Sequence, residues 1–178
     1  FPCLASTMDE AARRRLVDAL TITAAAPTDP DALWCRDRYY DELDTRFDAG
    51  FDRDPGGAGG AGGDADMAPP AGRFVVARVD GRPVGCGGLV VRAPANAPAF
   101  AEVKRMWVDD ALRGLGIGYR ILDALEAGAR EMGHDLVRLD SARALTEAHA
   151  LYRRCGYAEI PRYNDNPYAH FWFEKRLA

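Results

Sequence analysis

The stretch Arg113-Gly114-Leu115-Gly116-Ile117-Gly118 decides how the rest of the chain is organised. It lies between an extended apolar run, residues 102–108, and a helical pattern that starts near Tyr119. Its three glycines lack Cβ atoms, so several backbone N–H groups can turn toward one point. The following helix adds unpaired N–H groups and the positive end of its dipole. The stretch therefore predicts a loop that binds an anion such as pyrophosphate, with Arg113 adding a charged hydrogen bond.

Two more common glycine motifs can be tested against this stretch. A Walker loop ends in Gly-Lys-Ser or Gly-Lys-Thr, whereas this chain continues Gly118-Tyr119-Arg120 and lacks the phosphate-binding lysine. A dinucleotide-binding fingerprint needs a third glycine where Tyr119 or Ile121 stands. Neither motif fits, and a plain glycine-rich turn between a strand and a helix stays open as the alternative.

Length and composition predict one globular domain. The chain has 178 residues, of which 48% are hydrophobic, enough for a single core. The formal net charge is −4 and the basic residues form no dense cluster, so we expect no nucleic-acid partner. The four cysteines include no Cys-x-x-Cys pair, which predicts reduced thiols, no metal and a cytoplasmic protein. No apolar run approaches the ~18 residues of a membrane helix, so we expect no membrane partner.

Hydrophobic periodicity predicts alternating helices and strands. A β-hairpin around Asp80-Gly81 leads into the strand before the glycine loop, which predicts an antiparallel meander at the sheet centre. The helix after the loop joins that strand to the next, which predicts a parallel, right-handed βαβ unit. The expected helices are 9–19, 30–50, 119–132 and 146–155, and the expected strands are 20–23, 74–79, 82–91, 101–108, 136–140, 157–160 and 170–177.

The segment between the first two expected strands has an unusual composition. Six acids against two arginines between Asp41 and Asp54 predict either a solvated helix face or an acidic rim that attracts a cationic substrate. Residues 55–63 are almost wholly glycine and alanine, which predicts a mobile loop. The helix that begins at Pro30 has one apolar stripe, expected to pack on the sheet: Leu33, Tyr40, Leu43 and Phe47.

The second half of the chain carries a longer motif. A strand ending Met106-Trp107-Val108, the Arg113–Gly118 loop, the strand 136–140 and a helix containing Leu151-Tyr152 follow one another in this order. This arrangement resembles the acyl-CoA-binding core of the GCN5-related N-acetyltransferase (GNAT) family, over about Leu20 to Leu177.

The resemblance also bears on domain organisation. The runs 40–52 and 163–175 look like a bacterial subgroup whose acetyltransferase domain also occurs behind a winged-helix regulator of the MarR type. The sequence holds no counterpart of that DNA-binding half. We therefore expect residues 1–19 to be an N-terminal extension or linker helix, and residues 20–178 to be the N-acetyltransferase domain.

The family implies a fold and a cosubstrate. The fold would be α/β, a mixed twisted sheet of about seven strands with helices on both faces, and the cosubstrate would be acetyl-CoA. Leu145 stands where the family often has asparagine, so no side-chain contact to CoA is expected there. The resemblance implies that the CoA pyrophosphate binds at Arg113, Gly114, Leu115, Gly116, Ile117 and Gly118, and that the pantetheine arm pairs with the main chain of Trp107 and Val108.

The chemistry of acetyl transfer suggests roles for a few polar residues. An alkyl ammonium with a pKa near 10.4 must first lose a proton, at a cost of about 4.6 kcal/mol at pH 7. Glu102 is the first candidate for the base, and Glu42 is an alternative that would bind or deprotonate the amine. The resemblance places an oxyanion donor at the backbone N–H of about Val108. It implies Tyr152 as the acid for the leaving thiolate, although a tyrosine on an apolar helix stripe also fits plain packing.

These residues predict an N-acetyltransferase that moves acetyl from acetyl-CoA to a primary amine of a small molecule, directly in a ternary complex. One alternative is a non-catalytic acyl-CoA sensor. Another is a peptide or protein N-acetyltransferase, since the acidic segment would suit a cationic acceptor of either size. The polar loop 161–168 is predicted to be a plain turn or a substrate lid. The sequence is compatible with a homodimer but does not determine the oligomeric state.

Overall fold

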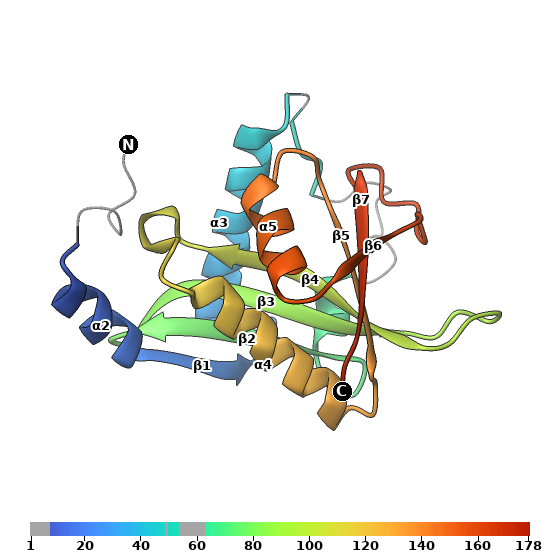
Figure 1. Ribbon diagram of the computed structural model, residues 1–178, viewed down its shortest axis with the longest axis horizontal. Helices are drawn as coiled ribbons and strands as arrows, with labels where there is room; N and C mark the ends of the chain where they lie inside the picture. Colours follow the sequence, from blue (N-terminus) through green and yellow to red (C-terminus); the bar gives the residue numbers. More distant parts are fainter. Residues whose placement is uncertain (1–7, 49, 54–62) are drawn as a thin grey trace.

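The Asp80-Gly81 turn closes a β-hairpin at the centre of the fold. Both residues have a left-handed backbone, with φ of 48° and 78°, which suits the twist of the adjoining strands. The hairpin joins β2 (Gly72–Val79) to β3 (Arg82–Arg92), and β3 pairs antiparallel with β4 (Phe100–Val108). The computed structural model, which describes residues 8–48, 50–53 and 63–178, thus confirms the expected meander (Figure 1).

A mixed sheet of seven strands extends from this hairpin, in the order β1-β2-β3-β4-β5-β7-β6. The pair β4 and β5 is parallel, as the crossover helix predicts, and the other pairs are antiparallel. The predicted sheet of about seven strands is confirmed. The remaining strands are β1 (Leu20–Ala25), β5 (Leu136–Ser141), β6 (Ala158–Ile160) and β7 (Phe171–Arg176).

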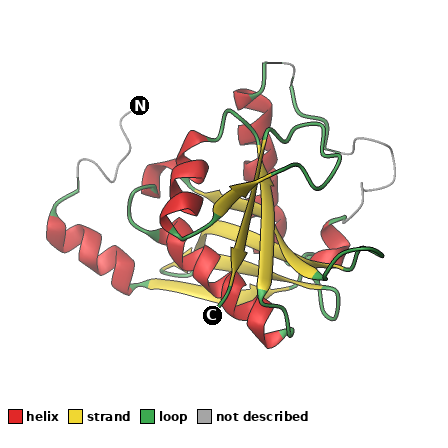
Figure 2. Cartoon of the chain, turned by 45° about the vertical axis from the view of Figure 1, so that its right-hand side comes forward, coloured by secondary structure: helices red, strands yellow, loops and turns green. Residues whose placement is uncertain are grey.

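Helices cover both faces of the sheet (Figure 2). On one face, α4 (Ile117–Glu131) buries Ile121 and Leu125 in the main core cluster. On the other face, α3 (Pro30–Arg46) contributes Cys35 to a second cluster that includes Phe74 and Trp107. The other helical elements are α2 (Glu10–Asp18), α5 (Thr146–Arg154), η1 (Asp64–Met67) and η2 (Asp110–Leu112).

The apolar stripe of α3 matches the prediction in its second half and differs from it in its first half. Leu33 is 43% exposed, while its neighbour Ala32 and Cys35 are fully buried. The small side chains of Ala32 and Cys35 thus take the buried positions in the first part of α3, while Tyr40 and Leu43 are buried as predicted. The helix ends at Arg46, with Phe47 as its C-cap, earlier than the expected Gly50.

The start of the chain and most of the expected glycine-alanine loop lie outside the described residues. Residues 1–7 and all but Gly63 of the expected loop 55–63 are not among those that the structure describes. Within the described chain, no helix is long and apolar enough to cross a membrane.

Candidate active site

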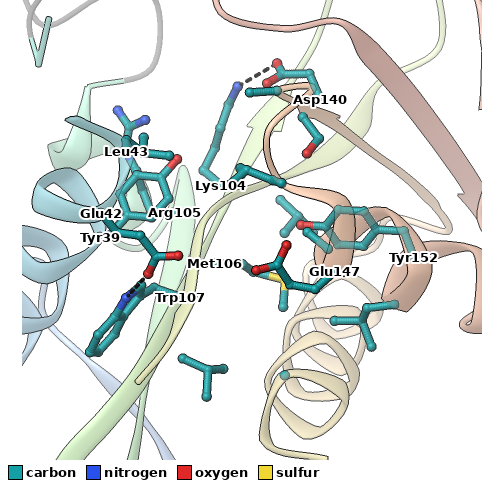
Figure 3. Close-up of a pocket in the computed structure, with 18 of the residues that line it drawn as sticks. Tyr39, Glu42, Leu43, Lys104, Arg105, Met106, Trp107, Asp140, Glu147 and Tyr152 are labelled. Atoms are coloured by element: carbon teal, nitrogen blue, oxygen red, sulfur yellow. Dashed lines mark hydrogen bonds and ion pairs between the residues drawn. The ribbon is translucent and has the colours of Figure 1, made fainter. Parts of the chain in front are cut away.

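A cavity of about 1170 Å³ opens where β4 and β5 separate. The registered partners of these two strands are Ala101 with Val137 and Glu102 with Arg138, and beyond Glu102 the strands diverge. Side chains from α3 and α5 line the resulting space, as Figure 3 shows for Tyr39 and Tyr152. A concave, largely apolar space of this kind is where a substrate is expected to bind.

The glycine loop forms one end of the cavity and has the backbone that an anion site requires. Gly114 and Gly116 have φ of 85° and 80°, the left-handed region that favours glycine. Gly116 is the N-cap of α4 and offers no side chain to the first N–H groups of the helix. Those N–H groups have no acceptor within their own helix, so a bound anion would satisfy them.

The third glycine, Gly118, lines the cavity and also lies at a contact between two helices, and its predicted part in cofactor binding stays a prediction. The helix starts at Ile117 rather than near Tyr119, so Gly118 lies inside its first turn. A Cβ at Gly118 would lie 3.3 Å from the Leu151 side chain of α5. Its small size therefore allows α4 and α5 to approach each other closely, whereas Gly114 and Gly116 face open space.

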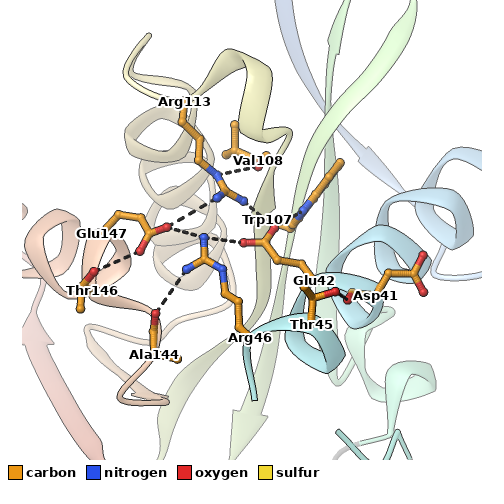
Figure 4. Close-up of polar contacts among 10 residues, drawn as sticks. All are labelled: Asp41, Glu42, Thr45, Arg46, Trp107, Val108, Arg113, Ala144, Thr146 and Glu147. Carbon is orange, nitrogen blue, oxygen red and sulfur yellow. Dashed lines mark hydrogen bonds and ion pairs between the residues drawn. The ribbon is translucent and has the colours of Figure 1, made fainter. Parts of the chain in front are cut away.

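The guanidinium of Arg113 is held by carboxylates at the mouth of the cavity (Figure 4). Its Nη2 donates to Glu42 of α3, and its Nη1 lies 3.5 Å from Glu147 of α5. Its Nε donates to the carbonyl oxygen of Val108 at 3.1 Å. The predicted pyrophosphate contact would thus require Arg113 to exchange carboxylates for phosphate oxygens.

Arg46 completes this ion-pair network. It lies 2.9 Å from Glu42 and donates to both Glu147 and the carbonyl of Ala144. The hydrogen bond from Arg46 is the main reason why the pKa of Glu147 is lowered to about 2. The network therefore ties α3, the glycine loop and the start of α5 together, and the lowered pKa of Glu147 keeps that carboxylate charged at neutral pH.

Trp107 and Val108 lie where β4 enters the cavity. The buried Trp107 indole donates from Nε1 to Glu42 at 2.9 Å. The Val108 carbonyl is already used by Arg113. Main-chain pairing with the pantetheine arm and an oxyanion donor at about Val108 both stay predictions.

Tyr152 lies in the cavity wall on α5, and Figure 3 shows its ring directed into the space between α3 and α5. The ring packs between Tyr157 and Phe173, with centroids 6.0 and 5.7 Å away. Burial raises the pKa of the Tyr152 phenol above its ordinary value. The hydroxyl is therefore protonated at neutral pH, the form in which it can donate to a leaving thiolate.

Glu102 occupies a different environment from the one expected of a base. It is 2% exposed and is not among the residues that line the cavity. Its carboxylate lies 2.8 Å from Arg92 and 3.1 Å from Lys104. It also accepts hydrogen bonds from Tyr163 and Asn164 of the loop before β7. The base role stays a prediction, but two cations and two neutral donors already occupy the carboxylate, and it lies outside the cavity lining.

Among the described residues, the carboxylates that line the cavity are all paired with cations and form no acidic rim. Each of those that line it lies within 4.0 Å of a lysine or arginine nitrogen, and the lining contains at least as many bases as acids. The described lining therefore offers a cationic acceptor no excess negative charge. The lining acids are Glu42, Asp64, Asp140, Glu147 and Asp165, and the lining bases are Arg46, Arg53, Lys104, Arg105, Arg113 and Arg154.

Sequence reasoning missed two cavity residues. Asp140 accepts from Lys104 at 3.2 Å and from Asn164 and Asn166 at 2.6 and 2.9 Å, which fastens the loop 161–168 beside the cavity. It ends a parallel strand, a recurrent place for site residues, and this signal could have identified it. Arg105 carried no such signal, because its position depends on a bulge in β4. In the described part of the chain, no group of three His, Cys, Asp or Glu residues could hold a metal ion.

Comparisons with known proteins find similar acetyltransferases. An IAA acetyltransferase of Azospirillum brasilense is 38% identical over 93 residues, which are 52% of this chain and 59% of that protein, less than two thirds of its length. The N-alpha-acetyltransferase RimI of Mycobacterium tuberculosis is 33% identical over 144 residues, 80% of this chain and 82% of that protein.

A solved structure shares the fold. It comes from a Klebsiella pneumoniae protein provisionally described as an acyl-CoA N-acyltransferase, with a TM-score of 0.67 and 28% identity over 89% of this chain and 98% of that one. The model of the Acetyltransferase (GNAT) family matches residues 30–157, from the start of α3 to the turn after α5. The chain therefore belongs to the GNAT family of acetyltransferases.

Proposed function

We propose that this enzyme transfers the acetyl group of acetyl-CoA to a primary amine of a small molecule, by direct attack in a ternary complex. One observation carries the proposal. A continuous cavity joins the glycine loop, the Tyr152 hydroxyl and an end lined by aromatic and charged side chains of α3. Donor and acceptor can thus meet in one space without an acyl-enzyme between them.

The donor end fits an acyl-CoA. The left-handed Gly114 and Gly116 and the free N-terminal N–H groups of α4 suit a pyrophosphate. Arg113 lies beside them and can turn from its carboxylate partners to phosphate oxygens. The acetyltransferases among the relatives support acetyl as the acyl group.

The acceptor end favours a small molecule. Tyr168, from the loop before β7, accepts a hydrogen bond on its hydroxyl from the Asp52 N–H at 2.9 Å. Its ring lies 5.6 Å from Phe47 and 4.8 Å from Phe51. These contacts join two loops across the cavity. An extended peptide would need an open groove at this place, whereas a small molecule would not.

The proposed step forms a C–N bond and breaks the C–S bond of the thioester. One proton leaves the attacking amine and one proton ends on the CoA sulfur, so the neutral amine and thioester give an amide and a thiol. Tyr152 would donate its proton toward the departing sulfur. Each carboxylate in the described cavity wall is paired with a cation. The proton of the amine would therefore be accepted by water and not by one of these carboxylates.

Acetylation of a peptide N-terminus is the second candidate. The match to RimI over 82% of that protein favours it. It would require the contacts between Tyr168 and the segment 47–52 to open.

A thiol-release assay tests both candidates. Acetyl-CoA is supplied with single amines, amino acids, polyamines or aminoglycosides, and in parallel with short peptides that have free N-termini. The proposal expects CoA release with at least one small amine and slower release with peptides. Faster release with peptides would favour the second candidate, and no release with any acceptor would contradict both.

A further inference from the structure

The backbone of Arg105 adopts an unusual conformation inside a β-strand. Its φ is 54°, in the left-handed region that non-glycine residues rarely enter. The pairing of β3 with β4 shifts here: Cys86 faces Trp107, while Gly88 already faces Lys104. A bulge of this kind usually takes glycine at the left-handed position. Arginine in its place indicates that the side chain has a use that offsets the strain.

The bulge directs the Arg105 guanidinium to the α3 side of the cavity. Its Nε lies 3.2 Å from Asp64, and the group sits over the Tyr40 ring at 5.3 Å. Asp64 also pairs with Arg36 at 3.3 Å, so two guanidinium groups share one carboxylate. Among the described residues, the group formed by Arg36, Arg105 and Asp64 therefore carries one positive charge in excess.

Part of the guanidinium remains available to a ligand. Among the residues that the structure describes, Asp64 is the one acid within ion-pair distance of Arg105, and it is reached through Nε. A side-chain hydrogen bond also joins Arg105 to the hydroxyl of Tyr39. A guanidinium carries five N–H donors, so its Nη atoms still have donors that can bind a carboxylate. Arg105 lines the cavity and its side chain is 23% exposed, so a ligand there can reach it.

Arg105 and Tyr152 lie on opposite sides of the same cavity. Figure 3 shows Arg105 and Tyr39 toward α3 and Tyr152 toward α5. A small acceptor can therefore place one end at Arg105 and direct the other toward the thioester beside Tyr152.

From this geometry we propose that the acceptor carries a carboxylate, which binds to the Nη groups of Arg105 while its amine faces the acetyl group. The acceptor class is thus amino-acid-like, a molecule with both an amine and a carboxylate. This inference rests on the proposed acetyl transfer and adds the feature by which the acceptor is selected.

Matched acceptors test the inference. The thiol-release assay is run with the free L-amino acids and, separately, with their carboxamides, which differ in the carboxylate alone. A neighbouring carboxylate raises the pKa of the ammonium group, so intrinsic reactivity at neutral pH favours the carboxamide. A preference for the free acid must therefore come from the enzyme, and we expect at least one acid to exceed its amide tenfold in kcat/KM.

Variants locate the source of that preference. In Arg105→Gln and Arg105→Gly, the ratio of kcat/KM for the free acid to kcat/KM for the carboxamide should fall at least tenfold. The fall should come from a higher KM for the free acid. Arg105→Gly relieves the left-handed strain and so keeps the variant folded, which acetyl-CoA binding and thermal unfolding would verify. Arg53→Gln is the matched control: Arg53 stacks on the same Tyr40 ring at 5.1 Å but pairs with Asp37 and Asp41, so the preference should persist.

The outcomes separate the inference from the function on which it rests. Turnover of amines without a preference for the acid, or a preference that survives in Arg105→Gln, would overturn the role of Arg105 and leave acetyl transfer intact. Acetyl-CoA binding without turnover of any amine would overturn both.

Discussion

The Glu42 carboxylate of α3 accepts a hydrogen bond from Arg113 of the glycine loop, although 71 residues separate them in the chain. The same carboxylate accepts from Trp107 Nε1 at 2.9 Å and pairs with Arg46. The cation predicted to bind the CoA pyrophosphate is thus neutralised by the protein itself. An incoming anion has to compete with Glu42 for Arg113.

Replacing Glu42 by glutamine should tighten acetyl-CoA binding. The amide keeps an oxygen for the Trp107 indole but no longer competes as an anion, so Arg113 turns to the pyrophosphate at lower cost. A half-buried ion pair of this kind is worth about 1 kcal/mol, which corresponds to about a fivefold lower Kd. Isothermal titration of acetyl-CoA into Glu42→Gln measures the change.

Asp41→Asn is the control for this prediction. It removes one negative charge from the residue of α3 that precedes Glu42. The Asp41 carboxylate pairs with Arg38 and Arg53 and not with Arg113. The Kd of this variant should stay near that of the wild type. Weaker binding in Glu42→Gln would show that Glu42 positions Arg113 for the ligand rather than competing with it.

The sequence predicted those features that depend on neighbouring residues. Apolar runs on either side of the Asp80-Gly81 turn sufficed for the meander, and the glycines at 114 and 116 have the left-handed backbone expected of them. The environment of Glu102 could not be predicted, because the Tyr163 and Asn164 donors that cover it come from a loop about sixty residues away. The position of Arg105 could not be predicted either, because it follows from a register shift between β3 and β4.

Tyr152→Phe should separate catalysis from binding. Loss of the hydroxyl removes the proposed proton donor and should lower kcat about 100-fold, the usual scale for a general acid. Acetyl-CoA affinity should remain within about twofold, because the ring still fills its place against Phe173. Single-turnover CoA release together with titration of acetyl-CoA measures both quantities.

Tyr157→Phe provides the matched control for Tyr152. Its ring lies 6.0 Å from that of Tyr152 but it does not line the cavity, so kcat should be unaffected by loss of its hydroxyl. Equal kcat values for the two variants would remove Tyr152 from the reaction.

Glu102→Gln should act on stability rather than on catalysis. The buried carboxylate is paired with both Arg92 and Lys104, and removing one partner of a buried ion pair costs about 3 kcal/mol. Urea unfolding should show that loss, while kcat under native conditions falls by less than a factor of ten. A loss of a hundredfold or more in kcat at full stability would instead support Glu102 as the base.

The ion pair between Arg46 and Glu147 should stabilise the fold in a pH-dependent way. The hydrogen bond from Arg46 lowers the pKa of Glu147 from its ordinary 4.5 to about 2. A lowered pKa means that the stabilisation is complete above pH 4.5 and is lost as the pH falls toward 2.

Comparing wild type with Glu147→Gln by urea unfolding measures this effect. Glu147 is 49% exposed, so solvent screening limits the difference to about 0.5–1 kcal/mol at pH 6. The difference should shrink to zero near pH 2. A difference that is the same at pH 6 and pH 2 would show that packing, and not charge, is responsible.

Two glycines, one at each end of α4, allow a matched test of acetyl-CoA binding at the glycine loop. Gly116 and Gly133 flank the helix with φ of 80° and 82°, and a Cβ at either would meet no atom within 4 Å. Alanine at either position should therefore lower the free energy of unfolding by a similar amount, about 1 kcal/mol. Of these two glycines, only Gly116 borders the proposed anion site.

The most direct measurement is isothermal titration of acetyl-CoA into the wild type, Gly116→Ala and Gly133→Ala. We predict one equivalent bound per wild-type chain, at least tenfold weaker binding for Gly116→Ala, and wild-type affinity for Gly133→Ala. Absence of binding by the wild type, or equal Kd values for the two variants, would contradict this prediction.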